Sequence, residues 1–219
     1  LHLCDRRQRQ MCIRDRFTAA EAKIGYVGAY TYAEVISGYT SFYLGAKSVC
    51  PTVTMDVQFT GSWFSVSDEK SAAQNLIAKG SKLISQHADS MGAPSACEEA
   101  GVPNVSYNGS TLEACPDTFI VSSRIDWVPY FKYIIGQAME EKKIDTDWTG
   151  TLATNSVVLT ELGEKAPAEG TAAAITAAKE KLMNGTLHVF DTANFTVTVT
   201  ENKNKNATVD ENGKLTGYM

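Results

Sequence analysis

Polar and aromatic side chains follow five apolar segments of this 219-residue chain, each at the point where a strand should end. Rings at such points can stack on a planar ligand, and carboxylates and amides can bond its hydroxyls or ring nitrogens. In a parallel sheet all these points share the carboxyl edge, where ligands of open α/β sheets bind. The candidate ligand-binding residues are Tyr30, Trp63, Phe64, Asp89, Asn108, Arg124, Asp126 and Trp127.

The aromatic candidates also have structural interpretations. Tyr30 and Tyr32 flank a threonine and could pack at a helix entry. Trp63 and Phe64 are adjacent, and adjacent residues rarely face the same way. We therefore expect one ring of the pair in the core and the other free to stack on a ligand. Trp127 could simply anchor the helix that begins there.

The polar candidates have structural alternatives too. Asp89 could cap the helix that follows it. Asn108-Gly109 is a strong turn dipeptide in its own right. Arg124 is the only arginine after residue 16 and could be an edge or salt-bridge residue. We interpret His87 as a strand residue with a satisfied ring. The recurrence of such residues at five strand ends favours a ligand site.

The sequence contains no pattern typical of catalysis. Nucleotide-binding fingerprints of the forms GxGxxG and GxxxxGK[ST] are absent, as is the GxSxG nucleophile motif. His87 and His188 stand alone, without the spacing of a zinc site. We therefore predict a binding protein without metal or cofactor. The net charge of −5 argues against nucleic acid, and no apolar run approaches the ~20 residues of a transmembrane helix.

Strand-like and helix-like segments alternate along the chain. This order predicts an α/β fold, a parallel sheet flanked by helices on both faces. We place the N-cap of the second helix at Ser67. The predicted strands are 23–29, 53–60, 83–87, 104–107, 119–123 and 156–160, and 187–200 is extended. The predicted helices are 33–48, 68–79, 95–100, 127–142 and 169–183.

The first sixteen residues differ in composition from the rest of the chain. They contain five of the six arginines and two of the five cysteines. A basic arm for nucleic acid or membrane is one interpretation, but MCIRDR resembles translated adapter sequence, so we predict a foreign or disordered tract. Of the later cysteines, Cys97 and Cys115 could pair in an oxidising compartment. We favour free thiols over that pairing.

Three segments carry a family resemblance: KIGYVGAYTYAEVISGYTSFYLGAKSVCP, GSWFSVSDEKSAAQNLIAKGSKLISQHADS and SSRIDWVPYF. Over roughly residues 22–200 the chain resembles the basic membrane protein (BMP) family, substrate-binding lipoproteins of ABC importers. It is similar to the purine nucleoside receptors of that family. This resemblance implies a type I periplasmic-binding-protein fold with two lobes and a hinge.

The resemblance also implies a function without chemistry on the ligand. A purine nucleoside, purine base or similar small planar solute would lie between the lobes and pass to a membrane permease. In the family's purine receptors an acidic residue stands where this chain has Asn108, and an Asn both donates and accepts. A bare base is therefore an alternative to a nucleoside. We expect an extracytoplasmic monomer, either periplasmic or anchored to the membrane as a lipoprotein.

We predict four parts of the chain, the first and last from their composition and the middle two from the resemblance. Residues 1–16 are the foreign or disordered tract, and 17–126 are the α/β ligand-binding lobe, mostly the C-terminal lobe of the family. Residues 127–200 hold a hinge-crossing helix and the remaining elements of the two lobes. Residues 201–219 form a polar hairpin or a disordered, truncated end. The helix at 127–142 would pack on the first lobe, so we expect its side formed by Trp127, Tyr130 and Ile134 to be exposed here.

Two rival functions fit the same fold class. An enzyme acting on a nucleoside or sugar needs a base and a nucleophile or metal at the sheet edge, which the spacing does not provide. The ligand-sensing domain of a transcriptional regulator needs an upstream helix-turn-helix, for which residues 1–16 are too short. An upstream lipobox cysteine would favour transport, and an upstream helix-turn-helix would favour regulation.

Overall fold

The computed structural model describes residues 22–191. The predicted tract at 1–16, the polar end at 201–219 and most of the extended segment lie outside these residues. The strands of the described part are β1 Lys23–Gly28, β2 Thr54–Phe59, β3 Ile84–His87, β4 Asn104–Tyr107, β5 Phe119–Ile125 and β6 Val157–Leu159. Its helices are α1 Ala33–Val49, α2 Val66–Ala78, α3 Gly92–Ala100, α4 Val128–Met139 and α5 Thr171–Met183.

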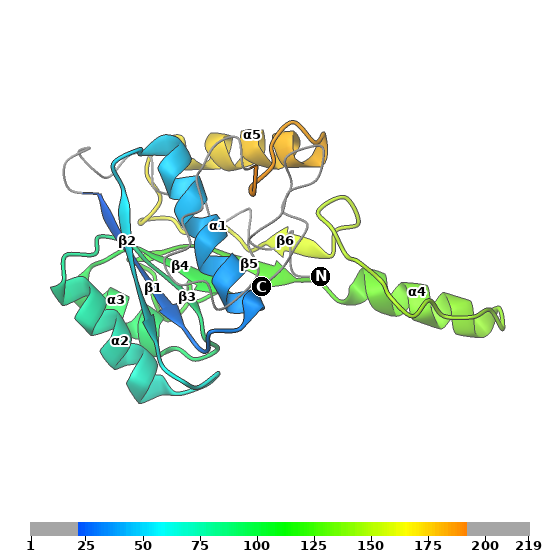
Figure 1. Cartoon of the computed structure of the whole chain (residues 1–219), viewed down its shortest axis with the longest axis horizontal. Coiled ribbons are helices and arrows are strands. Elements are labelled where there is room, and N and C mark those ends of the chain that lie inside the picture. Colours follow the sequence, from blue (N-terminus) through cyan, green and yellow to red (C-terminus); the bar gives the residue numbers. More distant parts are fainter. Residues whose placement is uncertain (1–21, 192–219) are drawn as a thin grey trace, which may run out of the picture.

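The strands form one sheet in the order β2-β1-β3-β4-β5-β6 (Figure 1). The first five strands are parallel, as predicted, and the sixth runs antiparallel to β5. The reversal has a local cause. The chain returns from α4 beside the end of β5, where the Asp126 N–H donates to the Ser156 carbonyl at 2.9 Å. A strand that starts at that edge must run against its neighbour.

Helices cover both faces of the sheet because the strand side chains alternate. Ile24 and Tyr26 of β1 pack with Phe42 of α1 on one face. Val27 of the same strand packs with Leu76 of α2 on the other, together with apolar residues of α3. The α/β fold with helices on both faces is therefore confirmed, and its core lies on both sides of β1 and β3.

The helix α2 begins two residues earlier than the capping pattern predicts. Its N-cap is Ser65, not Ser67, and the Ser65 hydroxyl accepts the Asp68 N–H at 3.4 Å. The reason is a second bond in the same turn, in which the Glu69 carboxylate accepts the Ser65 N–H at 3.1 Å. The helix ends as predicted, next to Gly80 at a φ of 93°.

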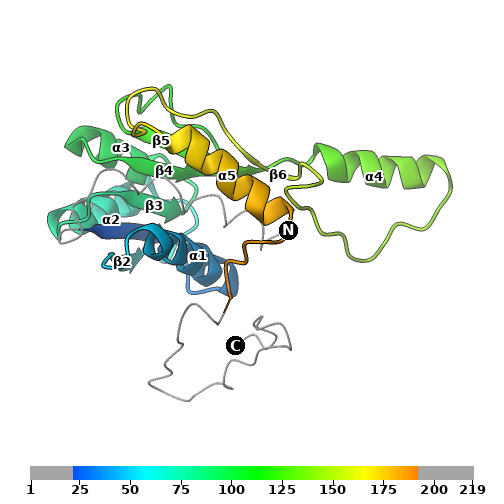
Figure 2. The same ribbon diagram turned by 90° about the horizontal axis from the view of Figure 1, so that it is seen from above.

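Residues 127–155, which we call the α4 arm, extend away from the sheet (Figures 1 and 2). None of the 12 residues of α4 is buried, and Phe131 and Ile135 are 52% and 55% exposed. The returning segment is held on the helix by Trp148, whose ring lies 5.2 Å from that of Tyr130. Of the side expected to be exposed, Trp127 is exposed, whereas Tyr130 and Ile134 are partly buried. No helix of the described residues is long and apolar enough to span a membrane.

Candidate ligand-binding site

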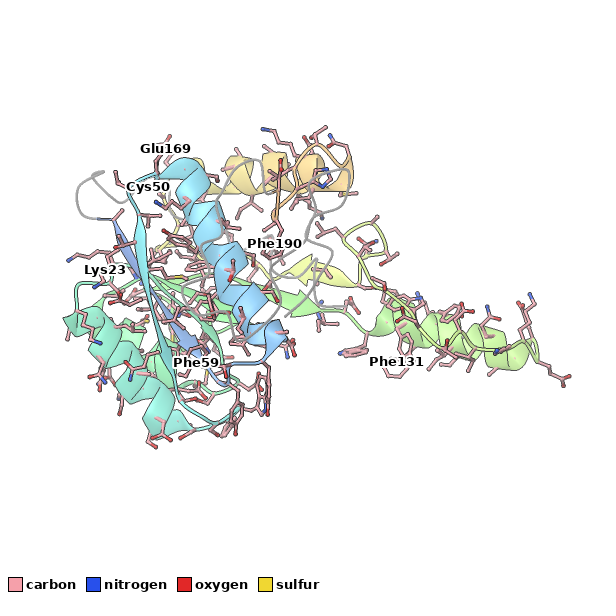
Figure 3. The ribbon with its side chains drawn as sticks, in the orientation of Figure 1. Lys23, Cys50, Phe59, Phe131, Glu169 and Phe190 are labelled. Atoms are coloured by element: carbon pink, nitrogen blue, oxygen red, sulfur yellow. The ribbon has the colours of Figure 1, made fainter. Side chains whose placement is uncertain are left out.

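The carboxyl ends of the parallel strands meet at one edge of the sheet. Figure 3 labels Lys23 at the start of β1 and Phe59 at the end of β2, and these two residues mark opposite edges. The loops after β1, β2, β3 and β4 all start at the end of the sheet where Phe59 lies. Most of the residues predicted from sequence lie in these loops, as the parallel topology requires.

Aromatic rings from four strand ends form a continuous group, which we call the aromatic cluster: Tyr30, Tyr32, Trp63, His87 and Tyr107. The indole of Trp63 stacks on Tyr32 at 6.0 Å between centroids and meets Tyr30 edge-on at 5.5 Å. His87 lies 6.5 Å from Trp63 and 4.3 Å from Tyr107. Trp63 is 37% exposed, so its ring is braced by neighbours and still accessible to a ligand.

The expectation that Trp63 or Phe64 lies in the core is wrong. Both rings are exposed, and Phe64 is the more exposed of the two at 66%. The alternation argument applies to a strand, whereas this pair lies in the loop between β2 and α2. There the Ser62 hydroxyl accepts the Phe64 N–H at 3.3 Å and turns the chain outward.

Asp89 lies beside Trp63. Its backbone N–H donates to the Trp63 carbonyl at 2.8 Å, and its side chain caps no helix, since the N-cap of α3 is Met91. Burial raises the pKa of the Asp89 carboxyl; Glu34 raises it further, and His87 opposes the change. The imidazole Nε2 of His87 lies 3.6 Å from a Glu34 carboxylate oxygen. The site therefore presents acceptors to a ligand that carries N–H or O–H groups.

Asp89→Asn should change the dependence of stability on pH. The folded protein holds the proton of this carboxyl more tightly than the unfolded chain does. The contribution of the carboxyl to the free energy of unfolding is therefore complete below its ordinary pKa of 3.8. That stability is lost as the pH rises through the raised pKa. We therefore expect Asp89→Asn to gain stability relative to the parent at pH 7 and to lose this advantage towards pH 4. Thermal unfolding across this range measures the effect.

The control for this prediction is Asp147→Asn, which removes an exposed carboxylate from the α4 arm. The comparison separates the effect of the buried Asp89 carboxyl from that of removing one negative charge. A stability difference between Asp89→Asn and the parent that stays constant from pH 4 to pH 7 would contradict the prediction.

Asp89 and Asn108 line the same cavity, of about 390 Å³, between the ends of β3 and β4. Gln86 and residues 89–91 and 107–111 form its walls. Asn108 has a φ of 64°, a left-handed conformation that Asn tolerates, and its N–H donates to the Ser123 carbonyl of β5 at 2.8 Å. The turn interpretation of Asn108 is thus correct, and the turn also places this residue at the cavity.

The last three candidates form a separate group at the base of the α4 arm. Arg124 and Asp126 lie 3.8 Å apart as a partly exposed ion pair. Asp126 also accepts the Val128 N–H at 2.9 Å and so caps the first turn of α4. Trp127 is 48% exposed and touches the rings of Tyr130 and Phe131. In the described residues these contacts link the group to the arm, not to the aromatic cluster.

Sequence reasoning missed three contributors to the site. Tyr107 ends β4 and was not singled out, although its position matches that of the other strand-end residues. Glu34 lies in the first turn of α1, and a helix that follows a parallel strand points its N-terminus at this same edge. His87 is indeed a buried strand residue, but it also joins Trp63 to Tyr107.

A larger hollow, of about 610 Å³, runs along the outer side of β2 and the end of α2. Its walls include Asp56, Gln58 and Lys79. None of the aromatic rings of the cluster lines this hollow. The hollow exists because β2 is an edge strand with no neighbour on its outer side, and no loops meet there. The smaller cavity at the carboxyl edge is therefore the candidate ligand site.

The described residues contain no cluster of three or more His, Cys, Asp or Glu side chains that could hold a metal ion. Cys97 and Cys115 are buried free thiols. Burial raises the pKa of Cys97 to about 12 and that of Cys115 to about 11. Thiols held protonated in this way are poor nucleophiles.

Comparison with solved structures identifies the class of fold. A solute-binding protein of an ABC transporter system from Conexibacter woesei is similar with a TM-score of 0.63 and 22% identity over 83% of this chain and 62% of that one. A transcriptional activator of the comK gene from Bacillus halodurans gives a TM-score of 0.70 at 16% identity, over 84% and 62%. The fold is therefore that of the periplasmic binding proteins, which importers and regulators share.

The family follows from the sequence match. The family model described as Bmp, ABC transporter substrate-binding protein PnrA-like, matches residues 17–193. The chain belongs to this family of solute-binding proteins of ABC transporters, which are not enzymes and which work outside the cytoplasm. The predicted family and the non-enzymatic function are thus confirmed.

Two curated relatives differ in what they are named for. A purine-binding protein of Brucella abortus is 35% identical over 107 residues, covering 49% of this chain and 31% of the relative. A putative ABC transporter glucose-binding protein of Haloferax volcanii is 30% identical over 168 residues, covering 76% and 42%. The chain spans less than half the length of either relative.

Proposed function

We propose that the protein binds a purine nucleoside, a purine base or a similar small planar solute and delivers it to the permease of an ABC importer. The observation that carries the proposal is the half-exposed indole of Trp63, braced by Tyr30 and Tyr32 and joined through the Asp89 N–H to the edge of the polar cavity. An accessible ring beside carboxylate and amide groups suits a planar heterocycle with N–H donors. The name of the Brucella relative supports the same ligand class.

We propose that the described residues are mainly one lobe of a two-lobed protein. The support is the α4 arm, whose helix exposes Val128, Phe131 and Ile135 at the spacing of one helix face. Apolar faces of this kind are normally covered in a folded protein. A second lobe of the same protein would cover this face, and closure of the two lobes would complete the ligand contacts. A lipid anchor and a monomeric state also belong to the proposal.

A sugar is the second candidate ligand. The relative that covers most of this chain is named for glucose, and an exposed Trp can also pack on the apolar face of a sugar ring. The two candidates differ in what they need from the site, because a purine offers an aromatic face and a sugar offers many hydroxyls.

A thermal-shift screen decides between these ligands. The probes are adenine, adenosine, guanosine, glucose and a set of amino acids. A ligand at a hundredfold excess over its Kd should add about 2.7 kcal/mol to stability, and we expect this from at least one purine. A shift with glucose and none with any purine would contradict the purine proposal and favour the sugar.

A further inference from the structure

A fully buried carboxylate joins two of the loops that form the candidate site. Glu69, in the first turn of α2, has no exposed surface. One of its oxygens accepts the Ser65 N–H at 3.1 Å, in the loop that carries Trp63. The other accepts the Ser90 N–H at 3.2 Å, in the loop that carries Asp89. One side chain therefore connects the ends of β2 and β3.

Further contacts make this connection rigid. The Asp89 N–H donates to the Trp63 carbonyl at 2.8 Å, so the two loops share a direct bond as well. At the start of α3, a Cβ added to Gly92 would lie 2.3 Å from the Val66 carbonyl and 2.9 Å from the Glu69 Cβ. The N-termini of α2 and α3 are thus packed closely against each other around the carboxylate.

The charge of Glu69 suits this place. Within residues 22–191 it makes no ion pair, and its two hydrogen bonds are with backbone N–H groups. Both donors lie at helix N-termini, where the helix dipoles favour a negative charge. A buried carboxylate with two such bonds is costly to alter, because each lost bond leaves a buried donor without its partner.

We propose that Glu69 is a positioning residue of the ligand site, which holds the stacking ring of Trp63 and the carboxylate of Asp89 in one fixed arrangement. This inference rests on the proposed function, since it assigns Glu69 to the site that binds the ligand. Glu69 itself does not reach the ligand. Its effect on binding passes through the two loops that it joins.

The variant Glu69→Gln tests the loops without a ligand. A glutamine has the same length, but its NH2 group would face one of the two backbone donors, so one bond is lost. Hydrogen exchange of the amides in residues 60–65 or 88–92 should then rise about tenfold in the loop whose bond is lost. Unchanged exchange in both loops would overturn the proposal.

Glu98→Gln is the matched control. Glu98, on α3, accepts the N–H groups of Asp117 and Thr118 at 3.1 and 3.0 Å, at the opposite edge of the sheet. Like Glu69, it accepts two backbone N–H groups, but far from the site; it also accepts the Thr118 hydroxyl at 2.6 Å and is only partly buried. It should lower stability without changing exchange in the two site loops.

The ligand readout is calorimetric titration with adenine and adenosine. We expect Glu69→Gln to weaken binding about tenfold and Glu98→Gln to leave it within twofold.

In a double-mutant cycle, the effects of Trp63→Phe and Glu69→Gln on binding should be non-additive, because both act on the same ring. Equal losses in the two Gln variants, or additive effects in the cycle, would leave Glu69 a purely structural role and overturn the proposal. If the parent protein binds neither probe, the purine proposal fails, and the exchange experiment decides the role of Glu69 alone.

Discussion

Trp63→Ala should weaken purine binding roughly 5- to 150-fold while leaving the fold intact. Stacking of a base on an aromatic side chain contributes about 1–3 kcal/mol, and each 1.4 kcal/mol is a factor of ten in affinity. Trp63 is 37% exposed and outside the buried core, so its removal should cost little stability in the absence of ligand. Calorimetric titration with adenosine, together with thermal unfolding of the free protein, measures both effects.

The chain offers a control of the same residue type. Trp148 packs on Tyr130 and Tyr133 of the α4 arm and has no ring contact with the aromatic cluster. Trp148→Ala should therefore bind adenosine as the parent does. Equal affinity of Trp63→Ala and the parent would show that the indole does not stack on the ligand, and a loss in Phe64→Ala alone would assign the stacking to the neighbouring ring.

Gly92→Ala should destabilise the protein by about 3 kcal/mol, the upper end of the range for overpacking. An alanine within a helix would otherwise gain about 1 kcal/mol over glycine. At this position the new Cβ would lie 2.3 Å from the Val66 carbonyl and 2.8 Å from the Lys70 nitrogen. These are backbone atoms of α2 and cannot rotate away, so the clash dominates. For a domain of this size the unfolding midpoint should fall by roughly 6–12 °C.

Gly136→Ala is the comparison for this prediction. Gly136 lies within α4, and an added Cβ there would meet no atom within 4 Å. Helix propensity alone then acts, and the midpoint should stay or rise slightly. A midpoint for Gly92→Ala that matches that of Gly136→Ala would show that α2 and α3 can separate without cost, and it would weaken the case that they hold the site loops rigidly.

Much of the fold is predictable from the sequence because local signals and tertiary demands agree. The apolar run from Lys23 to Gly28 is a buried strand in the sequence prediction and in the structure. Gly80 and Gly101 end their helices in the left-handed conformation. The structure differs from the sequence prediction where residues distant in the sequence determine the local conformation. Ser65 replaces Ser67 as N-cap because Glu69 reaches back to it, and β6 reverses because the arm returns beside β5.

The sequence predicts where the candidate site lies, at the carboxyl ends of the strands. It does not predict how the individual side chains are arranged there. Parallel topology brings the residues after each strand together, and it correctly placed Trp63, Asp89 and Asn108 near one another. It could not tell that Phe64 points outward, since loop conformation depends on the Ser62 hydroxyl. It also could not reveal Glu69, whose pattern is that of any helix start until the partner loop at Ser90 is known.

The α4 arm leaves and rejoins the sheet at one place, where Asp126 and Ser156 are hydrogen-bonded. This geometry makes the arm a lever with a single short pivot. A helix rises about 1.5 Å per residue, so α4 is roughly 18 Å long, and a turn of about 10° at the pivot moves its far end by about 3 Å. The pivot lies one strand away from Asn108, which is bonded to Ser123 of β5. The end of β5 therefore holds both the base of the arm and, through the Asn108 N–H, one wall of the cavity.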